Sequence, residues 1–348
     1  MPKIPAFAAS SPGRPLHAHT IERREPRAED VVLDILYCGV CHSDLHQARD
    51  EWGGSIFPMV PGHEIIGRVR RVGERVTKIK VGDLAGVGCF VDSCRTCDAC
   101  RRGLEQFCRN GAAFTYNSTE MDRKTPTHGG YSTQIVVAEP YVLRVPDGLE
   151  PAAAAPLLCA GITTYSPLRQ FGVKAGDRVG VVGLGGLGHM AVKLAASMGA
   201  EVTMLSTSRA KEADARRLGA HAFEHTRDEA TFAKLAGRFD LLIDTISVPH
   251  DYNKHLELLR PQGTMVLVGV PPEPTPVSAF SLIAGNRRLA GSMIGGIPET
   301  QEMLDYCGAN KIVSDIEVIA IQKINEAYER LVRADVRYRF VIDIASLR

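Results

Sequence analysis

Residues 178–188 read RVGVVGLGGLG, an apolar run followed by the pattern G-x-G-x-x-G. Because an amphipathic helix is expected to follow as far as about Met198, the pattern fits the dinucleotide-binding fingerprint of strand, glycine-rich turn and helix. The first glycine permits the tight turn, the second lets backbone approach a pyrophosphate, and the third permits close helix packing. The alternative is a glycine-rich turn that binds no ligand. The predicted cofactor-binding residues of this turn are Gly183, Gly185, Gly186, Leu187 and Gly188.

The sequence on both sides of this turn alternates between apolar strands and helix-like segments. Strand-like runs occur at residues 178–182, 201–206, 221–224, 239–246, 263–270 and 289–294. Six strands joined by helices are typical of a doubly wound parallel sheet, the Rossmann fold. We therefore predict an α/β chain in which residues 150–286 form the dinucleotide-binding domain.

The end of the second predicted strand indicates which dinucleotide binds. An NAD site usually places Asp or Glu about 20 residues after the fingerprint, to bind the ribose 2′-hydroxyl. Residues 205–211 read LSTSRAK and contain no carboxylate. Hydroxyls and cations favour a 2′-phosphate, because charge-assisted contacts bind it and a carboxylate would repel it. The alternative is that Ser208 caps the next helix while Arg209 and Lys211 face solvent. The residues predicted to bind NADP(H) here are Ser206, Thr207, Ser208, Arg209 and Lys211.

The two ends of the chain differ from its middle in their pattern of predicted strands and helices. The first 150 residues show little helical periodicity, and strand-like runs occur at 31–37, 65–72 and 84–90. The tail contains predicted helices near 299–309 and 324–333 and a strand-like run at 338–344. We predict a β-rich domain built from residues 1–149 and 287–348, with the tail folding back onto the first segment.

A loop in this β-rich part holds closely spaced cysteines, at Cys94, Cys97, Cys100 and Cys108. Four thiolates complete a tetrahedral zinc site and leave no position for substrate, so the spacing predicts a structural zinc ion. The alternatives are a disulfide pair and a nucleic-acid-binding zinc module.

A second metal site is predicted from Cys-His-Ser-Asp-Leu-His at 41–46, Pro-Gly-His-Glu at 61–64, and the distant Cys159. Two thiolates and one imidazole suit zinc, and three protein ligands leave the fourth position open for water or a substrate oxygen. Such an ion polarises a carbonyl group. Taken alone, any one such histidine is more often a packed or exposed residue than a ligand.

The composition excludes several classes of partner. The 348 residues carry 41 Lys and Arg against 40 Asp and Glu, without a long block of like charge. Nucleic acid and membrane surfaces are therefore not expected partners. The N-terminus lacks the apolar core of a signal peptide. An odd number of cysteines, nine, mostly spaced as metal ligands, favours a reducing compartment, so we expect a cytoplasmic protein.

These motifs together resemble one family over essentially the whole chain: the zinc-dependent medium-chain alcohol dehydrogenases. Within it the chain is most similar to the NADP-dependent cinnamyl alcohol dehydrogenase type and its bacterial aldehyde-reductase relatives. The resemblance is carried by GVCHSD at 39–44, PGHE at 61–64, the four-cysteine loop, PLLCAG at 156–161, residues 182–188 and GSMIG at 291–295.

The resemblance implies roles for individual residues. The β-rich domain would be GroES-like, with Cys41, His63 and Cys159 holding the catalytic zinc. Glu64 would replace a metal-bound water transiently, and Asp44 would orient the site. Ser43 would bind the substrate oxygen and relay a proton through the cofactor ribose to His46. The nicotinamide half would contact Thr163, Thr245, Val270, Ser292 and Ile294, and the substrate pocket would include Trp52, Cys89, Met293 and Ile294.

Blander interpretations of three of these residues stay open. Ser43 could satisfy loop backbone, His46 could be a solvated imidazole, and Glu64 could be an ordinary ion-pair partner.

The resemblance implies an enzyme, a reversible NADPH-linked reductase of aromatic or hydrophobic aliphatic aldehydes. Two zinc ions per chain and a homodimer formed through edge strands of the Rossmann domain are implied with it. Two alternatives remain: a polyol or secondary-alcohol dehydrogenase of the same superfamily, and a non-catalytic protein that binds zinc and NADPH.

Overall fold

In a computed structural model that describes residues 3–347, the chain forms two compact units. Unit 1 contains the residues up to Ile162 and those from Gly295 onward, and unit 2 spans Thr163–Ile294. Both boundaries lie later in the chain than the predicted ones at 149/150 and 286/287. The helix α3 (Pro151–Ala154) packs against β3 (Asp30–Val40) of unit 1, and β15 (Arg288–Gly291) completes the sheet of unit 2.

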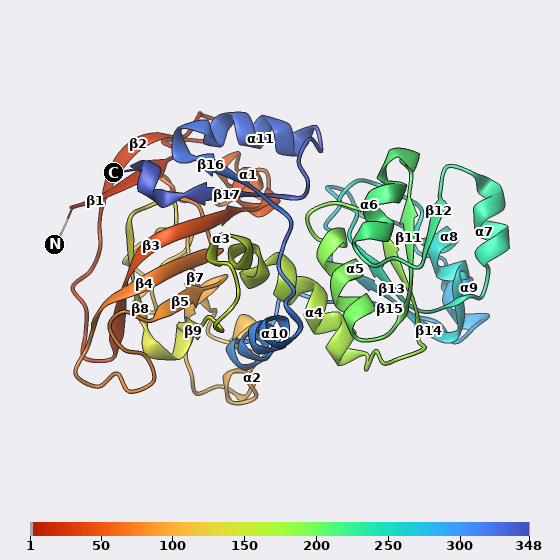
Figure 1. The fold of residues 1–348 in the computed structure, drawn as a ribbon, viewed down its shortest axis with the longest axis horizontal. Helices are drawn as coiled ribbons and strands as arrows, with labels where there is room; N and C mark the ends of the chain where they lie inside the picture. The colour runs from red at the N-terminus through yellow and green to blue at the C-terminus, as the bar shows by residue number, and fades with distance from the viewer. Residues whose placement is uncertain (1–2, 348) are drawn as a thin grey trace. The chain divides into compact units, whose positions relative to one another are not determined.

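Unit 1 is organised around a mostly antiparallel sheet with the strand order β16-β17-β3-β4-β5-β9, in which only β16 and β17 pair in parallel. The long strand β3 pairs with β4, β8 and β17, so the C-terminal strand β17 lies beside an N-terminal one (Figure 1). Val31, Leu33 and Ile35 of β3 are fully buried. The other strands are β4 (Ile65–Val72), β5 (Leu84–Val87), β8 (Gln134–Ala138), β9 (Leu143–Arg144), β16 (Ile316–Ala320) and β17 (Arg339–Asp343).

Smaller elements complete unit 1. Two further antiparallel pairs are formed by β1 (Lys3–Ala8) with β2 (His17–Glu22) and by β6 (Phe90–Asp92) with β7 (Ala113–Phe114). Its remaining α-helices are α1 (His42–Ala48), α2 (Asp98–Arg101), α10 (Ile297–Asn310) and α11 (Ile324–Val332). Short 3₁₀ helices lie at Glu105–Phe107, Glu139–Tyr141, Ala155–Leu158, Ile321–Lys323 and Ile344–Leu347.

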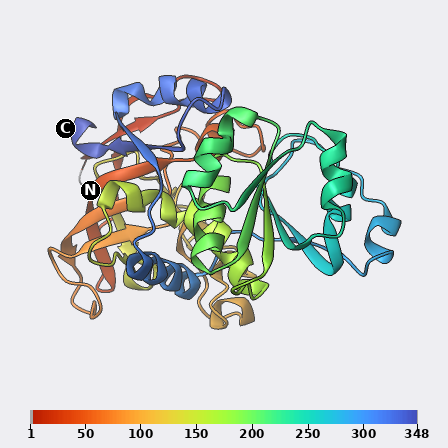
Figure 2. The same ribbon diagram turned by 45° about the vertical axis from the view of Figure 1, so that its right-hand side comes forward.

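Unit 2 is a six-stranded parallel sheet with the order β12-β11-β10-β13-β14-β15. Helices lie on both faces of this sheet (Figure 2), which explains why its strands read as nearly continuous apolar runs. The predicted Rossmann fold is confirmed. Its strands are β10 (Arg178–Val182), β11 (Glu201–Ser206), β12 (Ala222–His225), β13 (Phe239–Asp244), β14 (Leu259–Leu267) and β15.

The helices of unit 2 connect successive strands. One core cluster includes Val182, Leu205, Leu242 and Phe239, which come from three neighbouring strands. The helices are α4 (Ala160–Gln170, which begins in unit 1), α5 (Gly188–Ser197), α6 (Glu212–Arg217), α7 (Glu229–Leu235), α8 (Tyr252–Glu257) and α9 (Ala279–Ile283), and a 3₁₀ helix spans Arg209–Lys211.

A helix and a predicted strand of unit 1 are interrupted. The helix α3 ends at Ala154 and is followed by the 3₁₀ helix Ala155–Leu158, because Pro156 has no N–H for a regular helical bond. The run at 84–90 divides into the separate strands β5 and β6.

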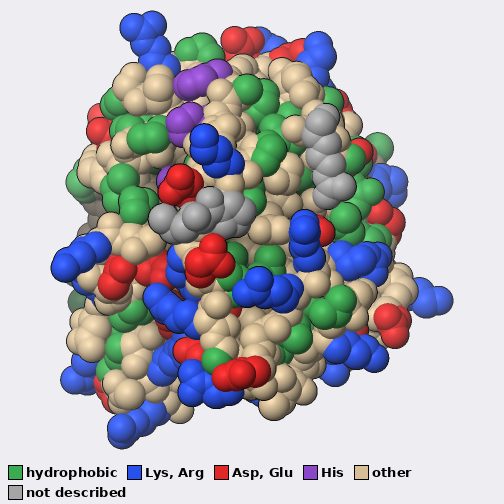
Figure 3. Space-filling model, turned by 90° about the vertical axis from the view of Figure 1, so that its left-hand side faces the viewer, with side chains coloured by type: hydrophobic (Ala, Val, Ile, Leu, Met, Phe, Trp, Pro, Cys, Tyr) green, Lys and Arg blue, Asp and Glu red, His purple; other side chains and the backbone are tan. Residues whose placement is uncertain are grey.

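The surface carries charges of both signs. Figure 3 shows one face of the molecule on which basic and acidic side chains are interspersed. Within residues 3–347, no helix has both the length and the apolar character that a membrane span requires.

Candidate active site

Unit 1 brings together four buried donor groups. The thiols of Cys41 and Cys159, a ring nitrogen of His63 and a carboxylate oxygen of Glu64 all lie within 4.8 Å of one another. The two sulfur atoms are 3.9 Å apart, although their residues are 118 positions apart in the chain. Two thiols and an imidazole at these distances are suited to the tetrahedral coordination of a zinc ion. The predicted ligands are therefore assembled, with Glu64 at the same point.

Asp44 organises this cluster from the first turn of α1. Cys41 is the N-cap residue of the helix, and the Asp44 carboxylate accepts the Cys41 backbone N–H at 2.8 Å in a capping-box arrangement. The same carboxylate accepts the backbone N–H of Gly62 at 3.1 Å and lies 3.3 Å from Nδ1 of His63. Nε2 is therefore the ring nitrogen left to bind a metal. This is the orienting role predicted for Asp44.

The contacts within the cluster shift the pKa values of its side chains. Hydrogen bonding to Cys159 lowers the pKa of the Cys41 thiol well below its usual range, and the nearby charge of Arg339 acts in the same direction. The pKa of Cys159 is raised instead, because it shares protons with Cys41 and Cys89. Burial opposes the charged form of His63, but the Asp44 carboxylate outweighs it and raises the pKa of the imidazole. The raised pKa of His63 thus places a positive charge beside the Cys41 thiolate.

Glu64 forms an ion pair with a partner that was not predicted, Arg339. Its carboxylate bonds the Arg339 guanidinium, and the side chains are 0% and 3% exposed. Burial raises the pKa of Glu64 to about 8, although Arg339 opposes that shift. The only sequence signal was an arginine at the start of an otherwise apolar terminal strand. Glu64 is thus both an ion-pair partner, as the blander interpretation held, and close enough to the other donors to be a ligand.

Ser43 and His46 lie on α1, beside the cluster and further along the helix. The Ser43 hydroxyl is 3.6 Å from the Cys41 sulfur. His46 is not an isolated surface imidazole, because its Nδ1 bonds the Glu51 carboxylate and its ring stacks on Trp52 at 5.1 Å. Glu51 was not predicted. Trp52 is 53% exposed, and within unit 1 its ring stacks on that of His46.

The four-cysteine loop forms the second donor cluster. The sulfur atoms of Cys94, Cys97, Cys100 and Cys108 lie within 4.8 Å of one another. Backbone N–H groups of Thr96 and Cys97 lower the pKa of Cys94 to about 6, so this thiol is readily ionised. All nine cysteines of the chain are free thiols, which rules out the disulfide alternative in this structure. The cluster has the composition of a closed structural zinc site.

The glycine-rich turn of unit 2 has the geometry of a phosphate cradle. Gly183 has φ +90°, which only glycine adopts readily, and a Cβ on Gly188 would lie 2.0 Å from the Gly183 carbonyl oxygen. No atom lies within 4 Å of a Cβ placed on Gly185, so space is open there for a ligand. The Thr245 hydroxyl donates to the carbonyls of Val182 and Gly183, at 2.8 and 3.1 Å. Thr245 therefore supports the turn from β13.

Residues 206–211 follow β11 and contact this turn. Ser208 precedes the short helix Arg209–Lys211, but its side chain makes no cap hydrogen bond. Nζ of Lys211 donates to the Leu184 carbonyl at 2.7 Å. Ser208 therefore does not cap through its side chain and Lys211 is not fully solvated, whereas Arg209 is exposed, as the alternative expected. His225, which was not predicted, contacts the Thr207 carbonyl at 3.1 Å.

The remaining predicted residues belong to different units. Thr163 is buried, Val270 is exposed, and the Ser292 backbone N–H donates to Leu267 at 3.1 Å. Ile294 has φ 41°, an unfavourable conformation for a β-branched residue that is typical of functional sites. Cys89 and Trp52 lie in unit 1, whereas Met293 and Ile294 lie in unit 2, so their shared pocket stays a prediction.

Comparisons with known proteins bear on this geometry. Residues 27–147 match the alcohol dehydrogenase GroES-like domain, and residues 186–308 match the zinc-binding dehydrogenase family. The chain is 57% identical to NADP-dependent alcohol dehydrogenase C 1 of Mycolicibacterium smegmatis, over 100% of both chains. The chain belongs to the zinc-dependent alcohol dehydrogenases. It is also 54% identical to aldehyde reductase YahK of Escherichia coli, over 99% of both chains.

Solved structures of this dehydrogenase family agree with the fold. A cinnamyl alcohol dehydrogenase from Sorghum bicolor superposes with a TM-score of 0.96 at 44% identity, covering 99% of this chain and 98% of that one. A cinnamyl alcohol dehydrogenase from Helicobacter pylori, solved with NADP(H), gives 0.93 at 44% identity, covering 99% and 98%. The predicted family and its two-part fold, a GroES-like domain and a Rossmann sheet, are confirmed. The two donor clusters of this dehydrogenase fit two zinc ions.

Proposed function

We propose that this dehydrogenase reduces aldehydes to primary alcohols with NADPH, reversibly, at the Cys41–His63–Cys159 cluster. The observation that carries the proposal is the buried set of two thiols and an imidazole, of which one thiol has a lowered pKa. The names of the most similar relatives, NADP-dependent alcohol dehydrogenase and aldehyde reductase, support it.

The residues of the site have separate roles in metal binding, orientation and proton transfer. A bound zinc ion would supply an electrophile that polarises the aldehyde carbonyl, and a bound nicotinamide would supply the hydride. Cys41, His63 and Cys159 would hold the metal, and Asp44 fixes the ring of His63. Ser43 gives its hydroxyl proton to the product oxygen. His46 replaces that proton, since imidazole exchanges protons near neutral pH and Glu51 orients its ring.

The cofactor specificity follows from residues of unit 2. The glycine-rich turn binds the pyrophosphate, and Ser206, Thr207, Ser208, Arg209 and Lys211 bind the 2′-phosphate. Five groups without a nearby carboxylate among residues 205–211 support NADP(H) over NAD(H). We propose that Thr163, Thr245, Val270, Ser292 and Ile294 surround the nicotinamide half.

The substrate class follows from the predicted pocket residues. Trp52, Cys89, Met293 and Ile294 are apolar or aromatic, which favours hydrophobic and aromatic aldehydes over sugars. A second candidate is a polyol dehydrogenase, because a protein named probable mannitol dehydrogenase from Fragaria ananassa is 50% identical to this chain. The side chains of the pocket favour the aldehyde reductase.

A substrate panel tests the proposed function directly. NADPH absorbance would be followed with aromatic, long aliphatic and sugar aldehydes, with matching ketones, and in reverse with mannitol. We expect aromatic and aliphatic aldehydes to be turned over with NADPH at least about 100-fold better than with NADH in kcat/KM. Preferred turnover of mannitol or ketones would establish the second candidate, and no turnover of any substrate would refute both.

The 2′-phosphate assignment has its own test. Arg209→Ala with Lys211→Ala is expected to raise KM for NADPH about 100-fold, since two charge-assisted contacts are lost. KM for NADH is the internal control, because damage to the glycine-rich turn would weaken both cofactors. Lys234→Ala, an exposed lysine elsewhere in unit 2, should change neither value. Equal losses for both cofactors would contradict the assignment.

We also propose a cytoplasmic homodimer. All nine cysteines are unpaired thiols, as a reducing compartment would keep them. β15 is the terminal strand of its sheet, and Phe280 and Ile283 of the neighbouring α9 are 74% and 69% exposed. An edge strand and exposed apolar side chains are both features suited to contact with a second copy. Sedimentation analysis should give a dimer for the wild type and a monomer for Ile283→Glu; a monomeric wild type would contradict it.

A further inference from the structure

The carboxylate of Asp44 has one partner that belongs to none of the motifs. Its Oδ1 accepts the Gly62 backbone N–H and faces Nδ1 of His63, while its Oδ2 accepts the Cys41 backbone N–H. The fourth donor is the hydroxyl of Tyr131, 3.2 Å from Oδ2. Asp44 and Tyr131 are both fully buried. Each oxygen therefore has two partners, and removal of one would leave a buried charge incompletely bonded.

Tyr131 also reaches the metal-binding loop through its backbone. The N–H groups of Gly129, Gly130 and Tyr131 donate to the carbonyls of Val60, Gly62 and Pro61, at 2.8, 2.9 and 3.0 Å. The approach is so close that a Cβ on Gly129 would lie 2.2 Å from the Pro61 carbonyl oxygen. The segment that carries Tyr131 is thus bonded along the loop that ends at His63.

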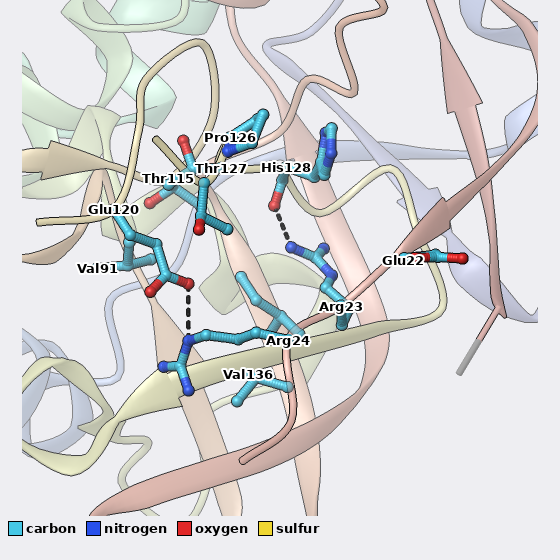
Figure 4. Close-up of a pocket in the computed structure, with 12 residues that line it drawn as sticks. Glu22, Arg23, Arg24, Val91, Thr115, Glu120, Pro126, Thr127, His128 and Val136 are labelled. Carbon is cyan, nitrogen blue, oxygen red and sulfur yellow. Dashed lines mark hydrogen bonds and ion pairs between the residues drawn. The ribbon is translucent and has the colours of Figure 1, made fainter. Parts of the chain in front are cut away.

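A buried arginine fixes this segment in turn. The guanidinium of Arg23 donates to the His128 carbonyl at 2.6 Å (Figure 4). It also donates to the carbonyls of Gly129 and Gln134, both at 3.0 Å, and to the Ser132 hydroxyl at 2.9 Å. Burial lowers the pKa of Arg23 to about 9, so the group remains charged at neutral pH. A charged group with four acceptors limits the movement of residues 128–134.

The ring of His63 has little other freedom. Tyr116 stacks on it with ring centroids 5.7 Å apart and an interplanar angle of 20°. Stacking limits tilting of the imidazole, but rotation in its own plane is set by the bond from Nδ1 to Asp44. Whatever holds Asp44 therefore sets the direction in which Nε2 points.

We propose that Tyr131 is a positioning residue for the catalytic metal. Its hydroxyl holds the Asp44 carboxylate, which holds the imidazole of His63, and the Arg23 bonds keep Tyr131 in place. The proposal rests on the proposed function in one respect, that the Cys41–His63–Cys159 cluster binds zinc. Partners of metal-ligating residues typically change metal affinity 10- to 100-fold, and Tyr131 acts through one intermediate, so about tenfold is expected.

The test uses Tyr131→Phe, which removes a single oxygen atom and keeps the ring. Zinc release from the fully loaded protein to a chelating dye would be followed in wild type and variant. The phase that Cys159→Ser eliminates reports the catalytic site, and the phase that Cys97→Ser eliminates reports the four-cysteine site. We expect Tyr131→Phe to accelerate only the catalytic phase, about tenfold. The d–d absorption of Co²⁺ substituted at that site should also shift, because its ligand geometry changes.

Tyr141→Phe is the matched control. Tyr141 is buried in the same unit, and its hydroxyl lies 2.6 Å from Ser93, which contacts Cys100 of the other site at 3.1 Å. This variant should leave release from the catalytic site unchanged. Unfolding temperatures of zinc-loaded and metal-free protein distinguish a positioning role from a merely structural one. A structural role would lower both temperatures equally, whereas the positioning role predicts that Tyr131→Phe lowers the unfolding temperature of the zinc-loaded protein more.

Two results would overturn the proposal in distinguishable ways. Wild-type release rates and an unshifted cobalt spectrum in Tyr131→Phe would refute the positioning role and leave the proposed function standing. A wild-type protein without zinc at the Cys41 cluster would refute both.

Discussion

The two donor clusters of unit 1 solve the same coordination problem differently. The four-cysteine cluster takes all its ligands from a loop between Cys94 and Cys108, and backbone N–H groups bond its sulfur atoms. The Cys41 cluster takes ligands from three separate places, all buried, and side chains provide its surroundings: Asp44, Arg339 and Tyr131. One cluster organises its own loop, whereas the other is organised by the fold.

The difference explains what each site is suited for. Four thiols close a tetrahedron, so the loop site stabilises structure and excludes substrate. Three ligands with a nearby carboxylate leave a position that substrate oxygen can occupy, and fixed neighbouring charges tune that position. Loss of the loop metal should therefore cost stability, and loss of the buried metal should cost catalysis.

The largest expected effect is that of Cys159→Ser. A hydroxyl is a poor zinc ligand, so the catalytic metal and its electrophilic contribution are lost, and kcat/KM for an aldehyde should fall on the order of 10⁴ or more. Steady-state NADPH oxidation measures it. Cys307→Ser, which changes another buried cysteine in unit 1, is the control and should keep near-normal turnover.

The next effect concerns proton delivery beside the buried site. Ser43→Ala should lower kcat by roughly 10² to 10⁴, the range of positioned acid–base groups, with zinc content unchanged. Ser43→Thr retains the hydroxyl and should recover most of the rate. His46→Ala should lose less, because water can partly replace the imidazole. Wild-type turnover in Ser43→Ala, with hydride transfer rate-limiting by deuterated cofactor, would exclude Ser43 as the donor.

Cys97→Ser should have the opposite profile to Cys159→Ser. Without the fourth thiolate the loop loses its metal, and the unfolding temperature should fall by roughly 10 °C. Turnover of the protein that remains folded should change less than about tenfold, because no reacting group lies at this site. Calorimetry and kinetics on one preparation measure both. A large catalytic loss with an unchanged unfolding temperature would reverse the roles assigned to the two sites.

The smallest expected effect is a loss of stability at acidic pH that depends on His128. Burial, with a contribution from Arg23, lowers the pKa of His128 to about 4, against about 6.5 in an unfolded chain. The unfolded state then binds the extra proton, so this contribution is complete above about pH 6.5 and is lost as the pH falls toward 4.

Between about pH 7 and 5.5 the wild-type free energy of unfolding should fall about 1 kcal/mol more than that of His128→Gln. Urea titrations at the two pH values measure this difference. His17→Gln, at an exposed histidine, should follow the wild type. Identical pH slopes in wild type and His128→Gln would contradict the assigned burial effect.

The contrast between the sites also shows how far the sequence could lead. The four-cysteine site and the glycine-rich turn were predictable because their chemistry is local: ligand spacing in one, and a strand, turn and helix in the other. The parallel sheet followed from alternating apolar strands. The Cys41 cluster, with the distant Cys159, could be proposed from motifs, and the resemblance then assigned the individual ligand roles.

Arg339, Tyr131 and Glu51 lay beyond the reach of sequence patterns. Arg339 meets Glu64 across 275 residues, and Tyr131 meets Asp44 across 87. Such partners are chosen by tertiary packing, and neither a spacing nor a periodicity marks them. Glu51 was near His46 in sequence, yet its pairing depended on the turn after α1. The units of the structure divide later in the chain than the predicted boundaries, because α3 packs on β3 of unit 1 and β15 completes the sheet of unit 2.

The most direct test of the account counts zinc and turnover in the same samples of wild type, Cys97→Ser and Cys159→Ser. Elemental analysis should give about two zinc ions per wild-type chain and about one in each variant, from the ligand sets of the two clusters. Only wild type and Cys97→Ser should oxidise NADPH with an aldehyde. A wild type with a single zinc ion, or full turnover in a Cys159→Ser protein that lacks its second zinc, would contradict the division between a structural and a catalytic metal.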